Sequence, residues 1–287
     1  MTRPASKTSA TIMQRAIGAG NLRTMQVAGK TRIADLYQKA NAKIRIPKQH
    51  SNRLEAVLIN TAGGLTGGDQ LRWSIEAGAG TTTMISTQAC ERIYRAQAGT
   101  ADVHTQLTVE SGAHCLWLPQ ETILFDGASL DRKLVANLDD GARLTALETV
   151  ILGREAMQEK LQNIALLDSW RVHNGERLIH ADAISIAGEG LEEMTNRAHM
   201  GDHLVFGTLI DAEPSRTATE QRVKLAVVEG VHKTCSRNDM ISVGVSVFDN
   251  KTIVRFTARS SYHLRQSIPD LLNQIVPGST LPTVWRL

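Results

Sequence analysis

The chain has 287 residues and a mass of 31.3 kDa, which is long enough to bury a full hydrophobic core. Its 32 lysines and arginines against 29 acidic residues leave a net charge of +3, too small to indicate nucleic-acid binding. Hydrophobic residues make up 42% and charged residues 21%, which is ordinary for a globular protein and excludes disorder for most of the chain. No apolar stretch approaches the roughly 20 residues of a membrane span.

The cysteines and the N-terminal composition indicate the cellular setting. Cys90, Cys115 and Cys235 are odd in number and far apart, so no disulfide framework is expected. Cys115 lies in an apolar run, where a free cysteine packs as a small hydrophobe. A reducing, cytoplasmic setting fits this usage. Residues 1–25 are basic and lack the apolar segment of a secretory signal, so we expect a flexible tail. No linker divides the chain, which predicts one domain over 1–287.

Short β-strands are predicted along most of the chain. They are recognised by alternation of polar and apolar residues, which buries one face and leaves the other wet, or by short apolar runs. In chain order the predicted strands are 56–59, 72–76, 81–85, 103–109, 134–138, 149–151 and 253–256. Turn-forming residues punctuate these runs at 139–141, 173–176 and 248–251.

Helical signals are few. Residues 261–275 have apolar side chains at helical spacing, and Pro269 would either kink a single helix or begin a second one. Residues 191–203 could hold a short helix. Residues 217–228 could form another, although the valines in this stretch leave a strand open. The chain is therefore predicted to be mainly β with a few helices, including a C-terminal helical segment.

A weak internal repeat suggests how the strands are arranged. The pattern acidic–x–Gly–Ala begins at Glu76, Glu110 and Asp139, so its copies start 34 and 29 residues apart. Each copy follows one predicted strand and precedes another, as in layers that bury their apolar faces against their neighbours. This favours an elongated, β-helix-like solenoid stack of short strands. The alternative is an ordinary sandwich in which Gly-Ala turns recur by chance, and the periodicity alone leaves both open.

The glycine-rich segment 60–69 is the most conspicuous local feature. Gly63 and Gly68 have the spacing of a phosphate-binding P-loop, but Asp69 stands where a P-loop needs its lysine. An acid at that position would repel phosphate. The simpler interpretation is a tight turn, in which glycine supplies a positive φ angle without steric cost. We therefore do not expect nucleotide binding here.

Two further segments place charges among apolar residues. Glu121 and Asp126 lie five residues apart and could be a general acid/base pair, or two acids on the wet side of a strand. Arg154 and Glu155 follow a predicted strand. Arg154 could grip a carboxylate in a fork geometry or be a solvated surface arginine. The sequence does not say whether its partner would be Glu121, Asp126 or Asp69.

The residues that ligate metals form no closed set. His199 and His203 have i, i+4 spacing, but Gly201 lies between them and the zincin pattern H-E-x-x-H is absent. His114 beside Cys115 could bind a soft or borderline ion. Neither a C-x-x-C pair nor a G-x-S-x-G elbow occurs. The residues by themselves therefore indicate a β-rich protein without a complete catalytic constellation.

A series of collinear segments resembles the UreD family of urease accessory proteins, called UreH in some organisms. One such segment would be weak, but the series spans nearly the whole chain and is specific. Two departures are Gln158, where the family often has glycine, and Asn60-Thr61, where many members have His-Pro. The segments are 29–38, 62–69, 87–95, 118–127, 152–157, 170–172 and 281–287, with Gly63, Gly64, Gly67, Gly68, Pro119 and Arg154 as motif positions.

The resemblance implies a scaffold of urease maturation that is not itself an enzyme. Such a protein binds the urease apoprotein and the accessory protein UreF, and this pair recruits UreG, a GTPase that delivers nickel. GTP hydrolysis is then expected in UreG. The family fold is a β-helix-like stack, in agreement with the repeat. A cytoplasmic location follows, with neither nucleic acid nor membrane as partner, and two copies joined through the accessory complex would be compatible with it.

The resemblance also implies a passing nickel ion and no tightly bound cofactor. Ni²⁺ accepts oxygen ligands, and a transient route has to release ions as readily as it takes them. Acids at the matching motif positions suit that role, so Asp69, Glu121, Asp126 and Glu155 are the candidate nickel route. The alternative is a standalone nickel-binding or storage protein, which would need tight binding by residues such as His114, Cys115, His199 and His203.

Overall fold

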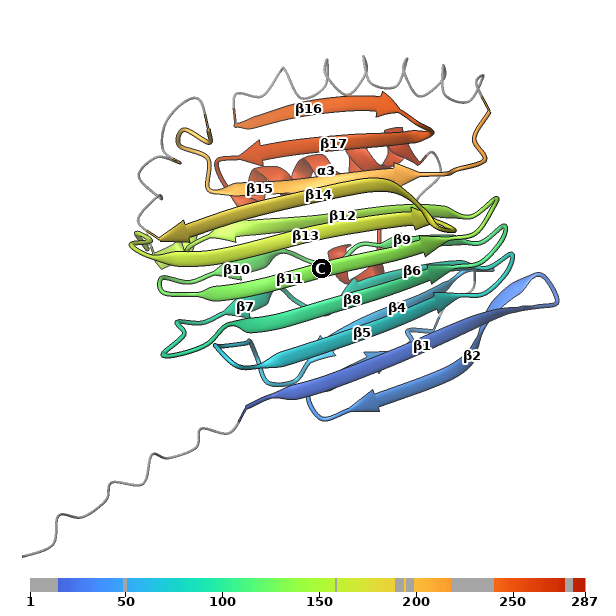
Figure 1. The fold of residues 1–287 in the computed structure, drawn as a ribbon, viewed down its shortest axis with the longest axis horizontal. Coiled ribbons are helices and arrows are strands. Elements are labelled where there is room, and N and C mark those ends of the chain that lie inside the picture. Colours follow the sequence, from blue (N-terminus) through green and yellow to red (C-terminus); the bar gives the residue numbers. More distant parts are fainter. Residues whose placement is uncertain are drawn as a thin grey trace, which may run out of the picture.

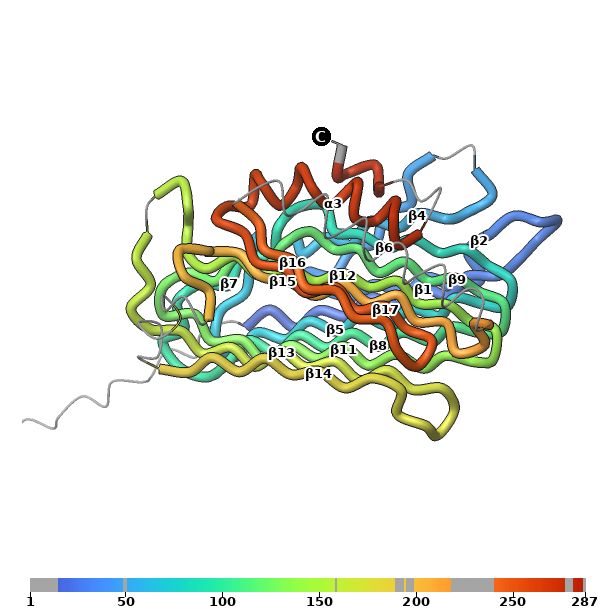
Figure 2. Tube along the Cα trace, turned by 90° about the horizontal axis from the view of Figure 1, so that it is seen from above, coloured from blue at the N-terminus to red at the C-terminus, as the bar shows by residue number. Residues whose placement is uncertain are grey.

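The part of the chain that the structure describes forms two facing β-sheets, with an α-helix on the outer face of the second sheet (Figures 1 and 2). This computed structural model describes residues 15–48, 51–157, 159–188, 194, 199–217, 240–276 and 281–286. The predicted class, mainly β with a C-terminal helix, is confirmed. Among the described residues, none of the helices combines the length and the apolar character that a membrane crossing needs.

The first sheet has seven strands in the spatial order β14-β13-β11-β8-β5-β1-β2. Its inner five strands are parallel, and the two edge strands, β14 and β2, pair antiparallel with their neighbours. The strands are β1 (Ile17–Val27), β2 (Lys30–Lys39), β5 (Gln70–Ala77), β8 (Ala101–Val109), β11 (Ser129–Leu138), β13 (Ile164–Asn174) and β14 (Arg177–Gly188).

The second sheet has ten strands and follows the order β16-β17-β15-β12-β9-β6-β4-β3, with β10 beside β12 and β7 beside β10. The central strands β4, β6, β9 and β12 are parallel. The strands are β3 (Ala42–Arg45), β4 (Leu54–Asn60), β6 (Thr82–Thr87), β7 (Glu91–Ile93), β9 (His114–Trp117), β10 (Thr122–Leu124), β12 (Arg143–Leu152), β15 (Val205–Ala212), β16 (Ile241–Phe248) and β17 (Lys251–Ala258).

The connection between the sheets makes the molecule a solenoid, as the repeat predicted. The chain passes alternately between the sheets, from β4 to β5, β6, β8, β9, β11, β12 and β13. Gln70 lies beside Asp102, Asp102 beside Asp131, and Asp131 beside Leu167, so successive turns are 32, 29 and 36 residues long. Residues about thirty positions apart in sequence therefore become neighbours in space.

The repeat seen in the sequence is real, but its first copy is displaced by two residues. Gly80, Gly112 and Gly141 stack at the turns that lead from the first sheet to the second, with φ angles of +68°, +67° and +72°. The left-handed region of these angles is open to glycine at little cost, which explains the recurrence. Gly78, the residue that the sequence pattern aligns with Gly112, packs instead against the backbone of Thr24 in β1.

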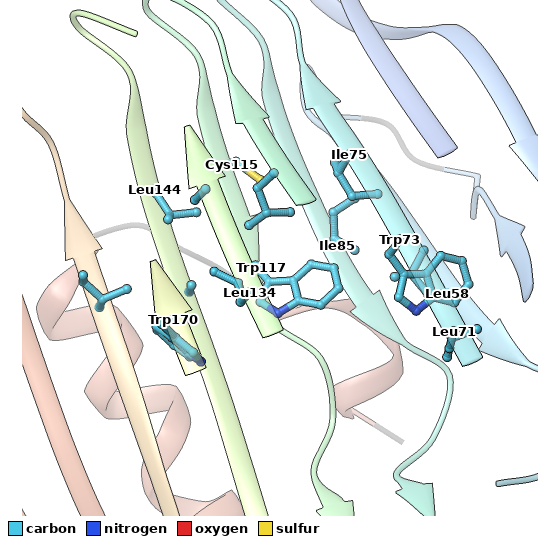
Figure 3. Close-up of a cluster of buried hydrophobic side chains, with 14 of the residues drawn as sticks. Leu58, Leu71, Trp73, Ile75, Ile85, Cys115, Trp117, Leu134, Leu144 and Trp170 are labelled. Atoms are coloured by element: carbon cyan, nitrogen blue, oxygen red, sulfur yellow. The ribbon is translucent and has the colours of Figure 1, made fainter. Parts of the chain in front are cut away.

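A hydrophobic core fills the space between the two sheets (Figure 3). Strands of the first sheet alternate buried and exposed residues, because successive side chains point to opposite faces. Three tryptophans, Trp73, Trp117 and Trp170, are at most 5% exposed in this core. Cys115 is fully buried there, as its apolar surroundings predicted. Burying each large apolar side chain contributes roughly 1.5–3 kcal/mol.

A second core lies between the second sheet and helix α3 (Ser261–Ile275), which Figure 2 shows lying along that sheet. The Ser260 side chain caps the helix by accepting from the His263 backbone N–H. Pro269 lies inside one continuous helix, so it does not begin a second one. The residues that α3 buries are Leu264, Ile268, Leu271, Leu272 and Ile275.

The last described residues, which include the short helix η2 (Thr283–Arg286), also bind the second sheet. The Thr283 backbone N–H donates to the Glu55 carboxylate at 2.7 Å. The Trp285 indole N–H donates to the Ser86 hydroxyl at 3.0 Å and to the Leu118 carbonyl at 3.1 Å. These contacts fasten the C-terminal segment beside α3.

The expected flexible tail over residues 1–25 is wrong for its second part. Residues 17–25 belong to β1, and alternate side chains of this strand pack inward, Leu22 being 1% exposed. The basic residues suggested a solvated tail, but Arg15 precedes the strand and Arg23 points outward from it, so neither interrupts the buried face of β1. Residues 1–14 lie outside the described part of the chain.

Two other helix predictions fall mostly outside the described residues. Of the stretch 191–203, only Met194 and residues 199–203 are described: Met194 is helical, as predicted, and residues 199–202 form a turn. Gly201 has a φ angle of +59° in that turn, which interrupts any helical spacing. The stretch 217–228 lies outside the described residues apart from Thr217.

A charged cluster lies inside the first core and joins its two sheets. Arg132 of β11 donates to both oxygens of Asp168 on β13, at 3.1 and 2.5 Å. Its third donor reaches the Thr122 hydroxyl of β10 at 3.0 Å. The Arg132 Nε also lies 3.3 Å from the Glu148 carboxylate of β12. Arg132 is therefore bound to both sheets.

Glu148 completes this cluster. The indole N–H groups of Trp117 and Trp170 each donate to one of its oxygens, at 3.0 Å. Burial raises the pKa of Glu148 above its ordinary value, although the Arg132 charge acts in the opposite direction. With Arg132 and Asp168 beside it, the pair of carboxylates shares a single cation in a site that water reaches little.

We predict that Arg132→Met lowers the free energy of unfolding by about 3–5 kcal/mol, because it leaves two carboxylates buried without their cation. The neighbouring Lys133 is the control, since its side chain is 46% exposed and pairs with Asp131 on the outer face. Lys133→Met should cost less than about 1 kcal/mol. Urea denaturation of both variants measures the difference, and equal costs would contradict the structural role of the cluster.

Candidate functional site

Four of the sequence motifs lie together at one end of the solenoid. They form the connections from the second sheet to the first, and we call this end, made by residues 60–69, 88–100, 118–128, 153–157 and 159–163, the motif end. In Figure 1 it is the side where β7 and β10 lie. Backbone hydrogen bonds join the connections in order, Leu65 to Arg92, Glu91 to Glu121 and Gly153 to Leu124, at 2.8–2.9 Å.

The glycine-rich segment is a tight turn, as its sequence predicted. Gly63, Gly64 and Gly68 take φ angles of +77°, +153° and +90°. Gly67 has an ordinary φ angle, but a Cβ there would lie 2.3 Å from the Ala98 carbonyl oxygen of the next turn. Glycines at 64 and 67 therefore let neighbouring connections approach closely.

Asp69 holds this turn in shape. One of its oxygens accepts from the Ala16 backbone N–H at 2.9 Å, and the other accepts from the Thr66 N–H at 2.8 Å. The side chain is nearly buried, Asp69 being 6% exposed. The carboxylate thus ties the start of β1 to the glycine-rich segment.

Glu121 is fully buried and is bound by helix α3. We call the group of Glu121, Arg265, Gln120 and Cys90 the latch. Arg265 of α3 donates to both Glu121 oxygens, at 2.7 and 2.6 Å, and to the Gln120 side-chain oxygen at 2.7 Å. The Cys90 thiol donates to Glu121 at 3.2 Å. The Arg265 guanidinium also lies 5.9 Å from the centre of the Trp285 ring.

The contacts of the latch shift the pKa values of Glu121 and Cys90 in opposite directions. Burial raises the pKa of Glu121, but the hydrogen bonds and the charge of Arg265 outweigh it and hold the pKa below its ordinary value. Burial, and then the Glu121 charge, raise the pKa of the Cys90 thiol to about 12. Cys90 is therefore a neutral thiol at physiological pH.

Asp126 and Arg154 organise the last two connections. Asp126 accepts from the Gln162 and Asn163 backbone N–H groups at 2.7 and 3.1 Å and pairs with Arg95. The Gln162 hydrogen bond is the largest of several causes that lower the pKa of Asp126. Arg154 grips Glu159 with two guanidinium donors, at 3.1 and 2.8 Å. The fork geometry is confirmed, but the partner is Glu159 and not Glu121, Asp126 or Asp69.

Glu155 is exposed and has the weakest contacts of the four candidate acids. Its carboxylate accepts from the Ser261 backbone N–H at 3.3 Å and from the Ser261 hydroxyl at 3.4 Å. Glu155 lies in the short helix η1 (Glu155–Met157). These bonds place the start of α3 beside the motif end.

The structure thus brings Asp69, Glu121, Asp126 and Glu155 to the same end of the solenoid, but with separate partners. Within the described residues, no group of three or more histidine, cysteine or acidic side chains is placed to hold a metal ion. Of the residues of the storage alternative, His114 lies 2.9 Å from the Thr145 hydroxyl. Cys115 is buried, which raises its pKa to about 12. His203 lies 2.6 Å from the Thr257 hydroxyl.

Three residues of the site escaped sequence reasoning: Cys90, Glu91 and Arg265. Glu91 accepts from the Asn60 side-chain amide at 3.0 Å, and burial raises its pKa to about 7. Cys90 and Glu91 lie inside the motif 87–95, which could have marked them as site residues. Asn60, the partner of Glu91, departs from the family pattern, which was a second indication. Arg265 gave none, because its partner Glu121 is 144 residues away.

The sequence model of the UreD urease accessory protein family matches residues 16–286. Urease accessory protein UreD of Rhizobium leguminosarum bv. trifolii (strain WSM2304) is 42% identical over 275 residues, covering 96% of each chain. The UreD protein of Agrobacterium fabrum is 39% identical, covering 96% of this chain and 92% of its own. That of Chelativorans sp. (strain BNC1) is 39% identical over 275 residues.

We predict that Arg265→Met lowers the free energy of unfolding by about 3 kcal/mol at neutral pH, because Glu121 then remains buried without its cation. Arg259→Met is the control: Arg259 pairs with Asp202 at 3.0 Å, but the two side chains are 45% and 63% exposed. The control should cost less than about 1 kcal/mol. Chemical denaturation measures both, and a similar cost for the two would contradict the latch.

The same latch predicts a pH dependence. Because the pKa of Glu121 is lowered on folding, its pairing stabilises fully above the unfolded-state value of about 4.3 and is lost as the pH falls through the folded value. The stability gap between the natural protein and Arg265→Met should therefore be full at pH 7 and shrink at pH 3–4. A gap that stays constant down to pH 3 would show that Arg265 acts through packing.

Proposed function

Because the chain belongs to the UreD family of urease accessory proteins, we propose that it is a non-catalytic scaffold of urease maturation. In this proposal it binds the urease apoprotein together with the accessory proteins UreF and UreG. It helps to deliver nickel, as cargo, to the urease active site. GTP hydrolysis belongs to UreG, since Asp69 stands at the position where a P-loop would need lysine.

The observation that supports a scaffold is the use of the charged motif residues. Glu121 binds Arg265, Arg154 binds Glu159, and Asp69 binds two backbone N–H groups. Each interaction fixes one connection of the motif end. Charged side chains that hold these connections rigidly suit a protein that presents a surface to partners.

The setting of this scaffold is proposed to be the cytoplasm, without nucleic acid or membrane as partner. Cys90 and Cys115 are both free thiols, as a reducing compartment would leave them. In this proposal, two copies of the chain are joined through the accessory complex. No tightly bound cofactor belongs to the proposal, and nickel is a passing cargo.

The nickel route remains part of the proposal, with Asp69, Glu121, Asp126 and Glu155 as its acids. Glu155 is the most accessible of them, and its contacts with Ser261, at 3.3 and 3.4 Å, are the longest. Glu121 would have to exchange Arg265 for the ion. An ion that moves on needs weak ligands, so Glu155 is the residue to test first.

Co-purification tests the scaffold directly. Tagged protein is expressed with the matching urease subunits, with and without UreF and UreG. We expect urease to be recovered with the tagged chain and UreG to join when UreF is present. A well-folded chain that retains neither urease nor UreF would contradict the scaffold. Equilibrium dialysis that finds several tightly held nickel ions per chain would then favour the storage alternative.

We predict that Glu155→Gln lowers urease activation and the nickel content of urease several-fold, while the complex is still recovered. The amide keeps an acceptor for Ser261 but removes the charge that attracts nickel. Glu176→Gln, an exposed acid at the hairpin between β13 and β14, is the matched control and should have no effect. The neutral variants Asp69→Asn, Glu121→Gln and Asp126→Asn follow in the same assay.

Each outcome of that assay separates a nickel role from a structural one. Normal activation by Glu155→Gln would remove this acid from the route. Loss of the complex in Asp69→Asn or Glu121→Gln would show that these two carboxylates serve only the structure.

A further inference from the structure

Exposed apolar side chains gather where the motif end meets the start of helix α3. Met157 is 72% exposed, Tyr262 is 65% exposed and Tyr94 is 37% exposed. Scattered apolar residues on a surface are normal, but neighbouring ones mark interaction sites. None of the three belongs to either hydrophobic core of the described residues.

Contacts join these residues into one face. The Tyr94 and Phe125 rings meet edge to face, 5.1 Å between centres, and the Arg154 guanidinium lies 4.7 Å over the Phe125 ring. On the other side, Glu155 binds Ser261, which precedes Tyr262. We call the exposed residues Tyr94, Arg95, Arg154, Met157, Lys160 and Tyr262 the arginine–aromatic face.

The accessible charge of this face is positive. The side chains of Arg95 and Arg154 are 68% and 47% exposed, and Lys160 is also exposed. The acids that pair with the arginines are turned inward, Asp126 being 15% and Glu159 12% exposed. Glu155 is an exposed acid at the border of the face, beside Ser261. At the two arginines, an approaching molecule meets the N–H donors before it meets the carboxylates of Asp126 and Glu159.

The face is also held in place before any partner arrives. The Tyr94 hydroxyl donates to the Gly63 carbonyl at 3.0 Å, and Glu159 and Phe125 fix Arg154 from two sides. Side chains that are already ordered lose little entropy on binding. Tyrosine, arginine and methionine are enriched at protein interfaces, and tyrosine and arginine among the residues that dominate their energy. A hollow of about 530 Å³ between Tyr94, Phe125 and Lys160 gives room for a side chain.

We propose that the arginine–aromatic face docks a protein partner through an acidic segment that carries an apolar side chain next to its carboxylates. The carboxylates would meet Arg95, Arg154 and Lys160, and the apolar side chain would cover Met157 and Tyr262. This rests on the proposed scaffold function and names the surface through which the scaffold holds one of its partners.

The test uses the full-length chain and a double variant, Met157→Asp with Lys160→Glu, which we call the end variant. Neither of these two side chains has a hydrogen bond or ion pair among the described contacts that a substitution would break. The matched control is Leu178→Asp with Arg177→Glu, at the opposite end of the solenoid, where Leu178 is 48% exposed and Arg177 is exposed. Binding of purified urease apoprotein and of purified UreF is measured for each protein, at low and at high salt.

We expect the end variant to bind one of these partners at least about tenfold more weakly, equivalent to about 1.4 kcal/mol, and the control to bind as the natural protein does. Added salt should weaken binding of the natural protein more than that of the end variant, because the variant reverses one attractive charge and adds one repulsive charge. Arg95→Gln should weaken binding less than Arg95→Glu, since it removes a charge without creating a repulsion.

Three results would overturn the proposal. Both partners could bind the end variant as tightly as the natural protein, or the control could lose as much binding as the end variant. Sedimentation could instead show that the end variant changes only self-association, in which case a second copy covers the face. A natural protein that binds neither partner would overturn the scaffold itself, which is a distinguishable failure.

Discussion

The in-register stacking of solenoid turns is the constraint on which the rest of the structure depends. Residues 70–77 of β5 pair one to one with residues 102–109 of β8, and β11 and β13 continue the same ladder. Because parallel strands in register start and end together, the connections at each end must also stack. Motifs that lie about thirty residues apart in sequence are thereby assembled into one surface, and a slip of a single residue would turn every side chain of a strand to the other face.

Burying charge costs desolvation free energy, yet a charged cluster lies at the centre of this stack. Arg132 and Asp168 come from the first sheet and Glu148 from the second, so their interactions fix how the two sheets sit on each other. Apolar contacts alone are tolerant of sliding, whereas a fork of hydrogen bonds to one carboxylate has a single good geometry. We infer that the cluster serves the alignment of the sheets more than the net stability of the fold.

The second set of buried polar contacts lies at the end of the stack. Arg265 reaches from α3 to Glu121, and Glu55 and Ser86 bind the C-terminal segment. The helix is thus connected both to the outer face of the second sheet and to one connection of the motif end. Rigidity from the core is carried in this way to the loops where the motifs lie.

Sequence alone predicted what depends on local periodicity. Alternation gave the strands, as at 72–76 and 103–109, and positive φ angles explain why glycine recurs at 112 and 141. Contacts over long separations were beyond reach: nothing in the helix 261–275 marks Arg265 as the partner of Glu121. The true first glycine of the repeat, Gly80, was missed because Gly78 offered a better match to the letters. The sequence showed an acidic residue at four motif positions. It could not show that three of these carboxylates, those of Asp69, Glu121 and Asp126, are held by backbone N–H groups or by an arginine.

The central claim is that the stack gathers its motifs into one rigid end that faces the urease maturation machinery. Hydrogen exchange of the backbone amides, with and without urease apoprotein and UreF, tests it most directly. The account predicts slowed exchange on binding within residues 60–69, 94–100, 125–128 and 153–157 and little change at the turns around Gly80, Gly112 and Gly141. Protection confined to those turns, or to the exposed hairpin of β1 and β2, would contradict it.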